Sequence, residues 1–244
     1  TTGNMFCGFY SIIAAIQGDF IVAAWSIMVA LIFDTMDGRV ARLTRATSAF
    51  GVEYDSLSAL LSFGLAPAIV TYLWCLEPFG RLGWLASFLY VVCTALRLAR
   101  FNVRVNSAPK KYFQGAPSPL AAALTATAVI FYTEIGNDLI AELQKAGIPF
   151  SRDIFMLTLM FVMASLMIST IRFSSFKDFK VSKENSFGIL AVGVLGLVLI
   201  AVKPAVTLFI MCLLYVLGSL GLELFRVLFR KEPLGSAASH EIKN

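Results

Sequence analysis

Three acidic side chains lie near the junction of two apolar segments. Asp34 and Asp37 are three residues apart, so on a helix they share one face, and Asp55 follows a linker that contains Gly51. Carboxylates that converge from two neighbouring helix ends make an all-oxygen site, which suits hard divalent cations such as Mg²⁺ or Mn²⁺. Acidic groups beside lipid are costly unless they are paired or bound to metal, so the pattern predicts a metal site. The alternative is that the acids only form ion pairs with nearby arginines: Arg39, Arg42 and Arg45.

The composition indicates an integral membrane protein. Of the 244 residues, 58% are hydrophobic and 14% are charged, and the mean hydropathy is +0.80, which is too apolar for an ordinary soluble domain. The four cysteines have no metal-ligand spacing, and His240 is the only histidine and lies in a polar tail. We therefore predict neither a zinc site nor histidine-based catalysis. The net charge of +5 reflects membrane topology and gives no reason to expect a nucleic-acid partner.

The apolar segments predict an all-α polytopic bundle of about eight transmembrane helices in the lipid bilayer. A single transmembrane catalytic domain is expected over residues 1–226, with a six-helix core at about 1–175, two further helices at about 187–226, and a polar tail at 227–244. Gly64 and Pro67 are expected to kink the third helix. The predicted helices are residues 4–17, 20–33, 56–76, 84–100, 119–133, 154–171, 187–202 and 204–225.

The charge distribution predicts the orientation of the bundle. Most of the twenty Lys and Arg residues fall in segments on the same side as the acidic cluster. Because basic loops remain cytoplasmic, we expect the acidic cluster and both termini at the cytoplasmic face.

The acidic cluster belongs to a longer pattern. From Asp34 to Asp55 the chain reads Asp-x2-Asp-Gly-x2-Ala-Arg-x8-Gly-x3-Asp. This pattern resembles the signature of the CDP-alcohol phosphatidyltransferases, which continues with x3-Asp. The chain meets every position but the last, where Ala59 stands in place of the family's final Asp.

The resemblance implies a fold, an activity and a set of site residues. The family fold is a membrane helical bundle, and the activity transfers a phosphatidyl group from a CDP-lipid to an alcohol and releases CMP. Asp34, Asp37 and Asp55 would hold two divalent ions, Mg²⁺ or Mn²⁺, with Ca²⁺ as a possible substitute. Asn4 is a polar residue in an apolar segment, facing the nucleotide or capping its helix, and Gly38 contacts either the nucleotide or a neighbouring helix. The expected CDP-lipid-binding residues are Asn4, Gly38, Arg42 and Ser48.

The acceptor alcohol is predicted from two further segments. Residues 97–102 (RLARFN) and 113–119 (FQGAPSP), with the two extra helices, resemble the bacterial and archaeal phosphatidylserine synthases of this family. The resemblance implies CDP-diacylglycerol and L-serine as substrates, a prokaryotic cytoplasmic membrane as the location, and a homodimer as a possible assembly. A serine carboxylate needs a cationic partner, although the arginines also fit a role as topology anchors. The candidate serine-binding residues are Arg97, Arg100, Asn102 and Gln114.

Ala59 predicts that this chain has little or no activity. In the family the last Asp binds metal and deprotonates the attacking hydroxyl, and a methyl group does neither. A single change in a complete motif fits an introduced inactivation better than a naturally inactive relative. The alternatives are a transferase for another acceptor, such as glycerol phosphate or an inositol phosphate, and a non-catalytic lipid-binding membrane protein. A transporter is disfavoured because the acidic motif has no inverted repeat.

Overall fold

The computed structural model describes residues 1–44, 48–104, 113–136, 151–173 and 186–229, together with Glu142 and Lys145. Some side chains at the ends of these segments lie outside the description, including those of residues 40–44, 113–114 and 172–173. The polar tail expected at 227–244 falls largely outside the described residues.

The regular secondary structure of the described chain is helical apart from one two-residue strand pair. The antiparallel pair joins β1 (Phe113–Gln114) to β2 (Arg172–Phe173). The helical elements, in chain order, are α1 (Thr2–Ile16), α2 (Phe20–Thr44), α3 (Ala49–Leu60), η1 (Leu61–Leu65), α4 (Ala66–Thr71), η2 (Tyr72–Leu76), η3 (Glu77–Phe79), α5 (Arg81–Arg104), α6 (Ser118–Phe131), η4 (Tyr132–Gly136), α8 (Arg152–Ile168), α9 (Ser186–Val202) and α10 (Pro204–Phe229).

The predicted all-α membrane fold is confirmed. Each predicted apolar segment coincides with a helix or a run of helical elements, and five of the described helices are long and apolar enough to cross a membrane. Eight crossings remain a prediction, because α1 has 15 residues and α8 and α9 have 17 each. The predicted end of the second helix near residue 33 is too early. α2 continues to Thr44, so its acidic residues lie within a continuous helix.

The third predicted helix is one rod built from α3, η1, α4 and η2. The π-helical turn η1 ends immediately before the short helix that contains Pro67. Proline has no backbone N–H to donate to the preceding turn, and π turns are one way in which a helix absorbs such a break. The structure shows a π-helical turn at this point, and the expected kink at Gly64 and Pro67 stays a prediction.

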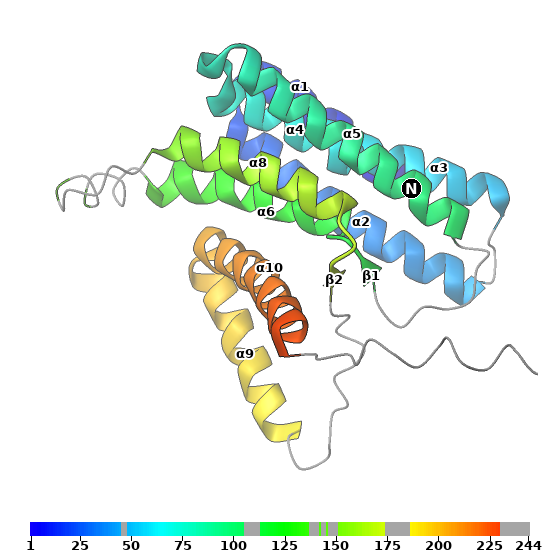
Figure 1. The fold of residues 1–244 in the computed structure, drawn as a ribbon. Helices are drawn as coiled ribbons and strands as arrows, with labels where there is room; N and C mark the ends of the chain where they lie inside the picture. The colour runs from blue at the N-terminus through cyan, green and yellow to red at the C-terminus, as the bar shows by residue number, and fades with distance from the viewer. Residues whose placement is uncertain are drawn as a thin grey trace, which may run out of the picture.

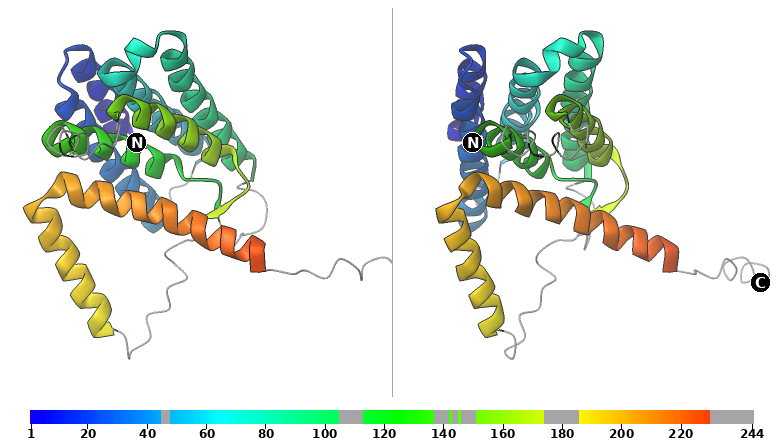
Figure 2. Two further views of the ribbon diagram at one scale, coloured as in Figure 1. Left: turned by 60° about the vertical axis from the view of Figure 1, so that its left-hand side comes forward. Right: turned by 90° about the vertical axis from the view of Figure 1, so that its left-hand side faces the viewer.

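The helices pack in layers (Figure 1). α1 lies against α2, α2 against α6, α5 against α8, and α6 against α10. Alanines fill much of the buried contact between α1, α2 and α6. Small residues let helix backbones approach closely where lipid supplies no hydrophobic driving force. α9 packs on α10 and diverges from the remaining helices (Figure 2).

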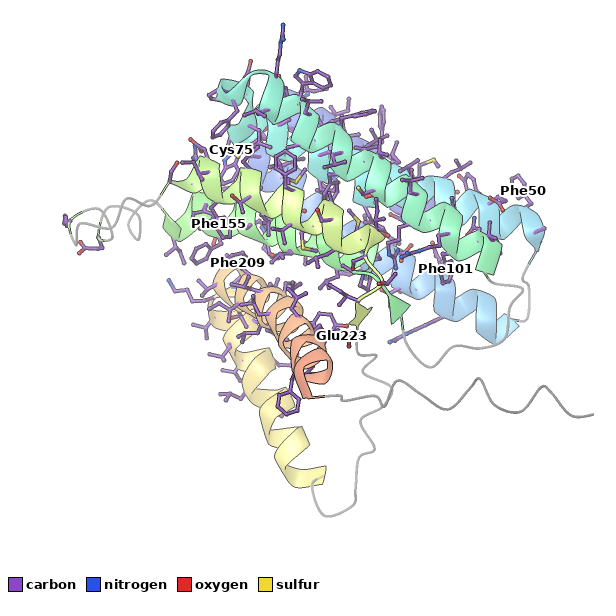
Figure 3. All side chains as sticks on the ribbon, in the orientation of Figure 1. Phe50, Cys75, Phe101, Phe155, Phe209 and Glu223 are labelled. Atoms are coloured by element: carbon purple, nitrogen blue, oxygen red, sulfur yellow. The ribbon has the colours of Figure 1, made fainter. Side chains whose placement is uncertain are left out.

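An aromatic cluster attaches α10 to the bundle. Phe209 of α10 stacks on Phe131 of α6, with ring centroids 4.9 Å apart, and it also contacts Tyr132 and Phe155 of α8. Figure 3 shows Phe155 and Phe209 facing one another, while Glu223 lies further along α10 on the side of β1 and β2. The cluster and the site described next are therefore at opposite ends of the bundle.

Candidate active site

The three predicted metal ligands approach one another around the first residue of the chain. α2 carries Asp34 and Asp37 on one face, and α3 carries Asp55 in its second turn. The amino group of Thr1 donates to Asp37, and the Thr1 hydroxyl is 3.5 Å from Oδ1 of Asp55. The half-buried Asp34 carboxylate also lies within reach of the charge of Asp55. Thr1 therefore contacts acids from two different helices, and the binding of metal by these acids stays a prediction.

Asn4 joins this acidic cluster from α1. Its side chain is fully buried, and its Nδ2 donates to Oδ1 of Asp34 at 3.3 Å. The carbonyl oxygen Oδ1 of Asn4 has no hydrogen-bond partner. Because a buried polar atom without a partner is costly, this oxygen marks a position where a ligand group or a water would be stabilised.

Two serines of the third helix fix the register of α1. Ser58 donates to the carbonyl of Thr1 at 3.1 Å, and Ser62 donates to the carbonyl of Asn4 at 2.9 Å. Gly8 makes this approach possible, because a Cβ there would lie 2.7 Å from the Cα of Ser62. The two hydrogen bonds hold the start of α1 beside the acids of α2.

The acidic cluster has donors that fit a divalent cation. The oxygen atoms of the cluster belong to carboxylate and amide groups, which are the ligands that Mg²⁺ and Mn²⁺ prefer. Among the described residues, no group of three Asp, Glu, His or Cys side chains is close enough together to hold a metal ion in the present arrangement. A bound ion would therefore have to replace the present contacts of Thr1.

Ala59 lies one helical turn beyond Asp55, on the same face of α3. It is 7% exposed and forms part of the buried core. An aspartate at this position would project from the same helix face as Asp55, one turn deeper into the bundle.

The structure describes the expected CDP-lipid residues unevenly. Gly38 is an exposed position of α2. Ser48 is the N-cap of α3, and its hydroxyl accepts a hydrogen bond from the backbone N–H of Gly51 at 3.0 Å. The backbone of Arg42 belongs to α2, but its side chain lies outside the described part of the chain. Gly38, Arg42 and Ser48 remain predicted ligands.

Among the predicted serine-binding residues, Arg97 has a hydrogen-bond donor without a partner. Its Nη1 donates to the hydroxyl of Ser118 at 2.9 Å, and its buried Nε has no partner. Among the described residues no carboxylate forms an ion pair with it. A partly buried guanidinium with a spare donor is a site for an anion.

The other predicted serine-binding residues contact neighbouring helices or belong to β1. Arg100 donates from Nη1 to the carbonyl of Ile168 at 3.1 Å. Asn102 donates to Ser56 at 2.9 Å and to Glu53 at 3.2 Å, which joins α5 to α3. Gln114 belongs to β1, and its side chain lies outside the description.

Sequence reasoning missed several residues that position these groups. The spacing of two of them was a signal that they share a helix face, because Ser58 and Ser62 lie four residues apart on the same helix as Asp55. Their hydrogen bonds to backbone carbonyls of α1 depend on how two helices pack, which the pattern does not specify. The missed residues are Glu53, Ser56, Ser58, Ser62 and Ser118.

Comparisons with known proteins identify the family. Residues 1–150 match the family model described as CDP-alcohol phosphatidyltransferase. The chain is 36% identical, over 209 residues, to a CDP-diacylglycerol–serine O-phosphatidyltransferase of Helicobacter pylori strain J99. The aligned region covers 86% of this chain and 83% of the relative. The chain is 38% identical over 136 residues to an archaetidylserine synthase of Methanothermobacter thermautotrophicus, covering 54% of this chain and 57% of the relative. A yeast CDP-diacylglycerol–serine O-phosphatidyltransferase is 38% identical over 141 residues, covering 50% and 48% of the two chains. The chain therefore belongs to the CDP-alcohol phosphatidyltransferase family.

Proposed function

We propose that the site transfers the phosphatidyl group of CDP-diacylglycerol to L-serine, giving phosphatidylserine and CMP, and that Ala59 blocks this reaction in the present chain. The observation that carries the proposal is the approach of Asp34, Asp37 and Asp55 from two helices around the start of α1. The names of the relatives support the choice of serine as acceptor.

The CDP-lipid binds where α1, α2 and α3 meet. Asp34, Asp37 and Asp55 hold divalent cations, Mg²⁺ or Mn²⁺, which would neutralise the charge of the diphosphate. The unpartnered Oδ1 of Asn4 accepts a hydrogen bond from the nucleotide. The acyl chains extend into the bilayer from a site at the cytoplasmic face. The distribution of basic residues supports this orientation.

L-Serine binds beside α5. The spare donors of Arg97 take the serine carboxylate. The remaining predicted serine-binding residues belong to α5 (Arg100 and Asn102) and β1 (Gln114). The serine hydroxyl attacks the phosphorus of the phosphatidyl group, the bond to the CMP oxygen breaks, and the hydroxyl proton passes to a base. An aspartate at position 59 would be that base, and general-base catalysis contributes typically ~10²–10⁴-fold to the rate.

Restoring the missing carboxylate tests the proposal. We expect Ala59→Asp to release CMP from CDP-diacylglycerol only when L-serine and Mg²⁺ or Mn²⁺ are present. The matched control is Ala59→Asn, which has nearly the same size but cannot accept the proton, and it should stay inactive. Turnover of Ala59→Asp with glycerol phosphate or an inositol phosphate in place of serine would contradict the proposed acceptor.

A second function is favoured by Ala59 alone. A protein that binds CDP-diacylglycerol without converting it would keep the three acids and have no use for the base. Tight CDP-diacylglycerol binding with no CMP release from Ala59→Asp, whichever acceptor is offered, would support this function and contradict the transferase.

A further inference from the structure

Two arginines on α5 make different kinds of contact, although their spacing suggested a shared role. Arg97 contacts the side chain of Ser118 and has a spare donor. Arg100 instead donates to two backbone carbonyls at the end of α8, to Ile168 at 3.1 Å and to Met167 at 3.3 Å. The last carbonyls of a helix have no partner within it and carry a partial negative charge, so a guanidinium there is well placed.

The same end of α8 also holds the segment that leads into α6. The backbone N–H of Gly115 donates to the carbonyl of Ile171 at 2.9 Å, and that of Ala116 donates to the carbonyl of Leu166 at 3.0 Å. The β1–β2 pair continues these contacts on the preceding residues. We call residues 115–118 the α6 entry turn, and the end of α8 fixes its position.

Gly115 allows Arg100 and the α6 entry turn to meet. Its φ is +80°, a conformation that residues with a side chain rarely adopt. A Cβ at this position would lie 3.0 Å from Nη2 of Arg100 and closer still to the carbonyl oxygen of Met167. Arg100, Gly115 and the end of α8 therefore pack as one unit.

The α6 entry turn ends at the residue that orients Arg97. Ser118 is 1% exposed and is the first residue of α6, and its hydroxyl accepts the hydrogen bond from Nη1 of Arg97. A displacement of the turn would move Ser118 and release Arg97. The contacts thus run from Arg100 through the turn to Ser118 and Arg97.

We propose that Arg100 is a positioning residue for the acceptor. It holds the α6 entry turn against α8, so that Ser118 orients Arg97, and Arg97 alone of the two arginines binds the serine carboxylate. This inference rests on the proposed function, because it assumes that serine binds beside α5.

The test measures equilibrium binding of L-serine to the chain in nanodiscs with CDP-diacylglycerol and Mn²⁺. Ala59 prevents turnover, so the Kd of each substrate is measured directly. Hydrogen bonds to charged groups lead us to expect a serine Kd raised about 30-fold in Arg97→Ala and about tenfold in Arg100→Ala. The Kd of CDP-diacylglycerol should stay within about twofold in both variants, since the hydrogen bonds of Arg97 and Arg100 go to Ser118 and the end of α8 and not to the acids proposed to hold that lipid.

Conservative variants separate a ligand from a positioning residue. Arg100→Lys should keep the serine Kd within about threefold of the unsubstituted chain, because an ammonium still suits a helix end. Arg97→Lys should not recover the affinity, because a lysine lacks the fork geometry that matches a carboxylate. The matched control is Arg81→Ala, an exposed arginine at the opposite end of α5, which should change neither Kd.

A double-mutant cycle decides the proposal. If Arg100 acts through Arg97, Arg100→Ala should raise the serine Kd by less than about twofold when Arg97 is already alanine. A full further tenfold loss in that background would mean that Arg100 binds serine itself and would overturn the proposal. If Arg100→Ala does not fold, Arg100→Met, which keeps the apolar stem of the side chain and removes its donors, replaces it in the cycle with the same two outcomes. Failure of the unsubstituted chain to bind serine would overturn the proposed acceptor as well, a result distinct from additive losses.

Discussion

Replacing Gly8 by alanine tests how α1 is held at the site. The added Cβ would lie 2.7 Å from the Cα of Ser62, a backbone atom that cannot rotate away. α1 must then move away from the third helix, which breaks the hydrogen bonds from Ser62 to Asn4 and from Ser58 to Thr1.

The cost follows from the overpacking and from the lost hydrogen bonds. Overpacking costs typically about 1–3 kcal/mol, and each lost hydrogen bond costs about 1 kcal/mol. We therefore expect Gly8→Ala to lower the free energy of unfolding by about 3–5 kcal/mol. Because Asn4 moves away from Asp34, the affinity for CDP-diacylglycerol should fall in the same variant.

Detergent-titration unfolding and CDP-diacylglycerol binding in nanodiscs measure the two effects. The matched control is Gly193→Ala in α9, where an added Cβ has no heavy atom within 4 Å. A Gly8→Ala protein as stable as this control, with unchanged lipid affinity, would refute the close approach of α1 to the third helix.

Three further substitutions address separate contacts. Asn4→Ala removes the donor to Asp34 and the unpartnered oxygen, and a titration should show CDP-diacylglycerol binding weakened about tenfold; unchanged affinity would remove Asn4 from the site. Phe209→Ala loses three aromatic contacts, each worth about 0.5–1.5 kcal/mol, so unfolding should become easier by roughly 2–4 kcal/mol while lipid affinity stays the same. Ser48→Ala removes the N-cap of α3 and should cost about 0.5–2 kcal/mol of stability, whereas a loss of lipid affinity at full stability would favour its predicted ligand role.

The sequence predicted the helices well because hydropathy and length determine them. The predicted segments match the observed elements, and the acid spacing placed Asp34 and Asp37 on one face of α2. The end of α2 was missed because charged and polar residues interrupt the apolar pattern after residue 33, although the helix continues to Thr44. Hydropathy reports where lipid ends, and a helix can continue beyond that point.

The contacts between helices were not predictable from the sequence. Nothing in the spacing of Arg97 and Arg100 shows that one contacts a serine side chain and the other the end of α8. The roles of Ser58 and Ser62 likewise depend on the approach of α1. Such contacts are set by packing in three dimensions, whereas a sequence pattern reports only which residues share a helix face.

The most direct test of the acidic site is CDP-diacylglycerol binding with and without Mn²⁺. The chain with Ala59 should bind the lipid in the presence of Mn²⁺, release it when EDTA removes the metal, and lose the metal-dependent binding in Asp37→Asn. Equal affinity with Mn²⁺ and with EDTA, unaffected by Asp37→Asn, would contradict the claim that carboxylates of α2 and α3 hold cations for the nucleotide diphosphate.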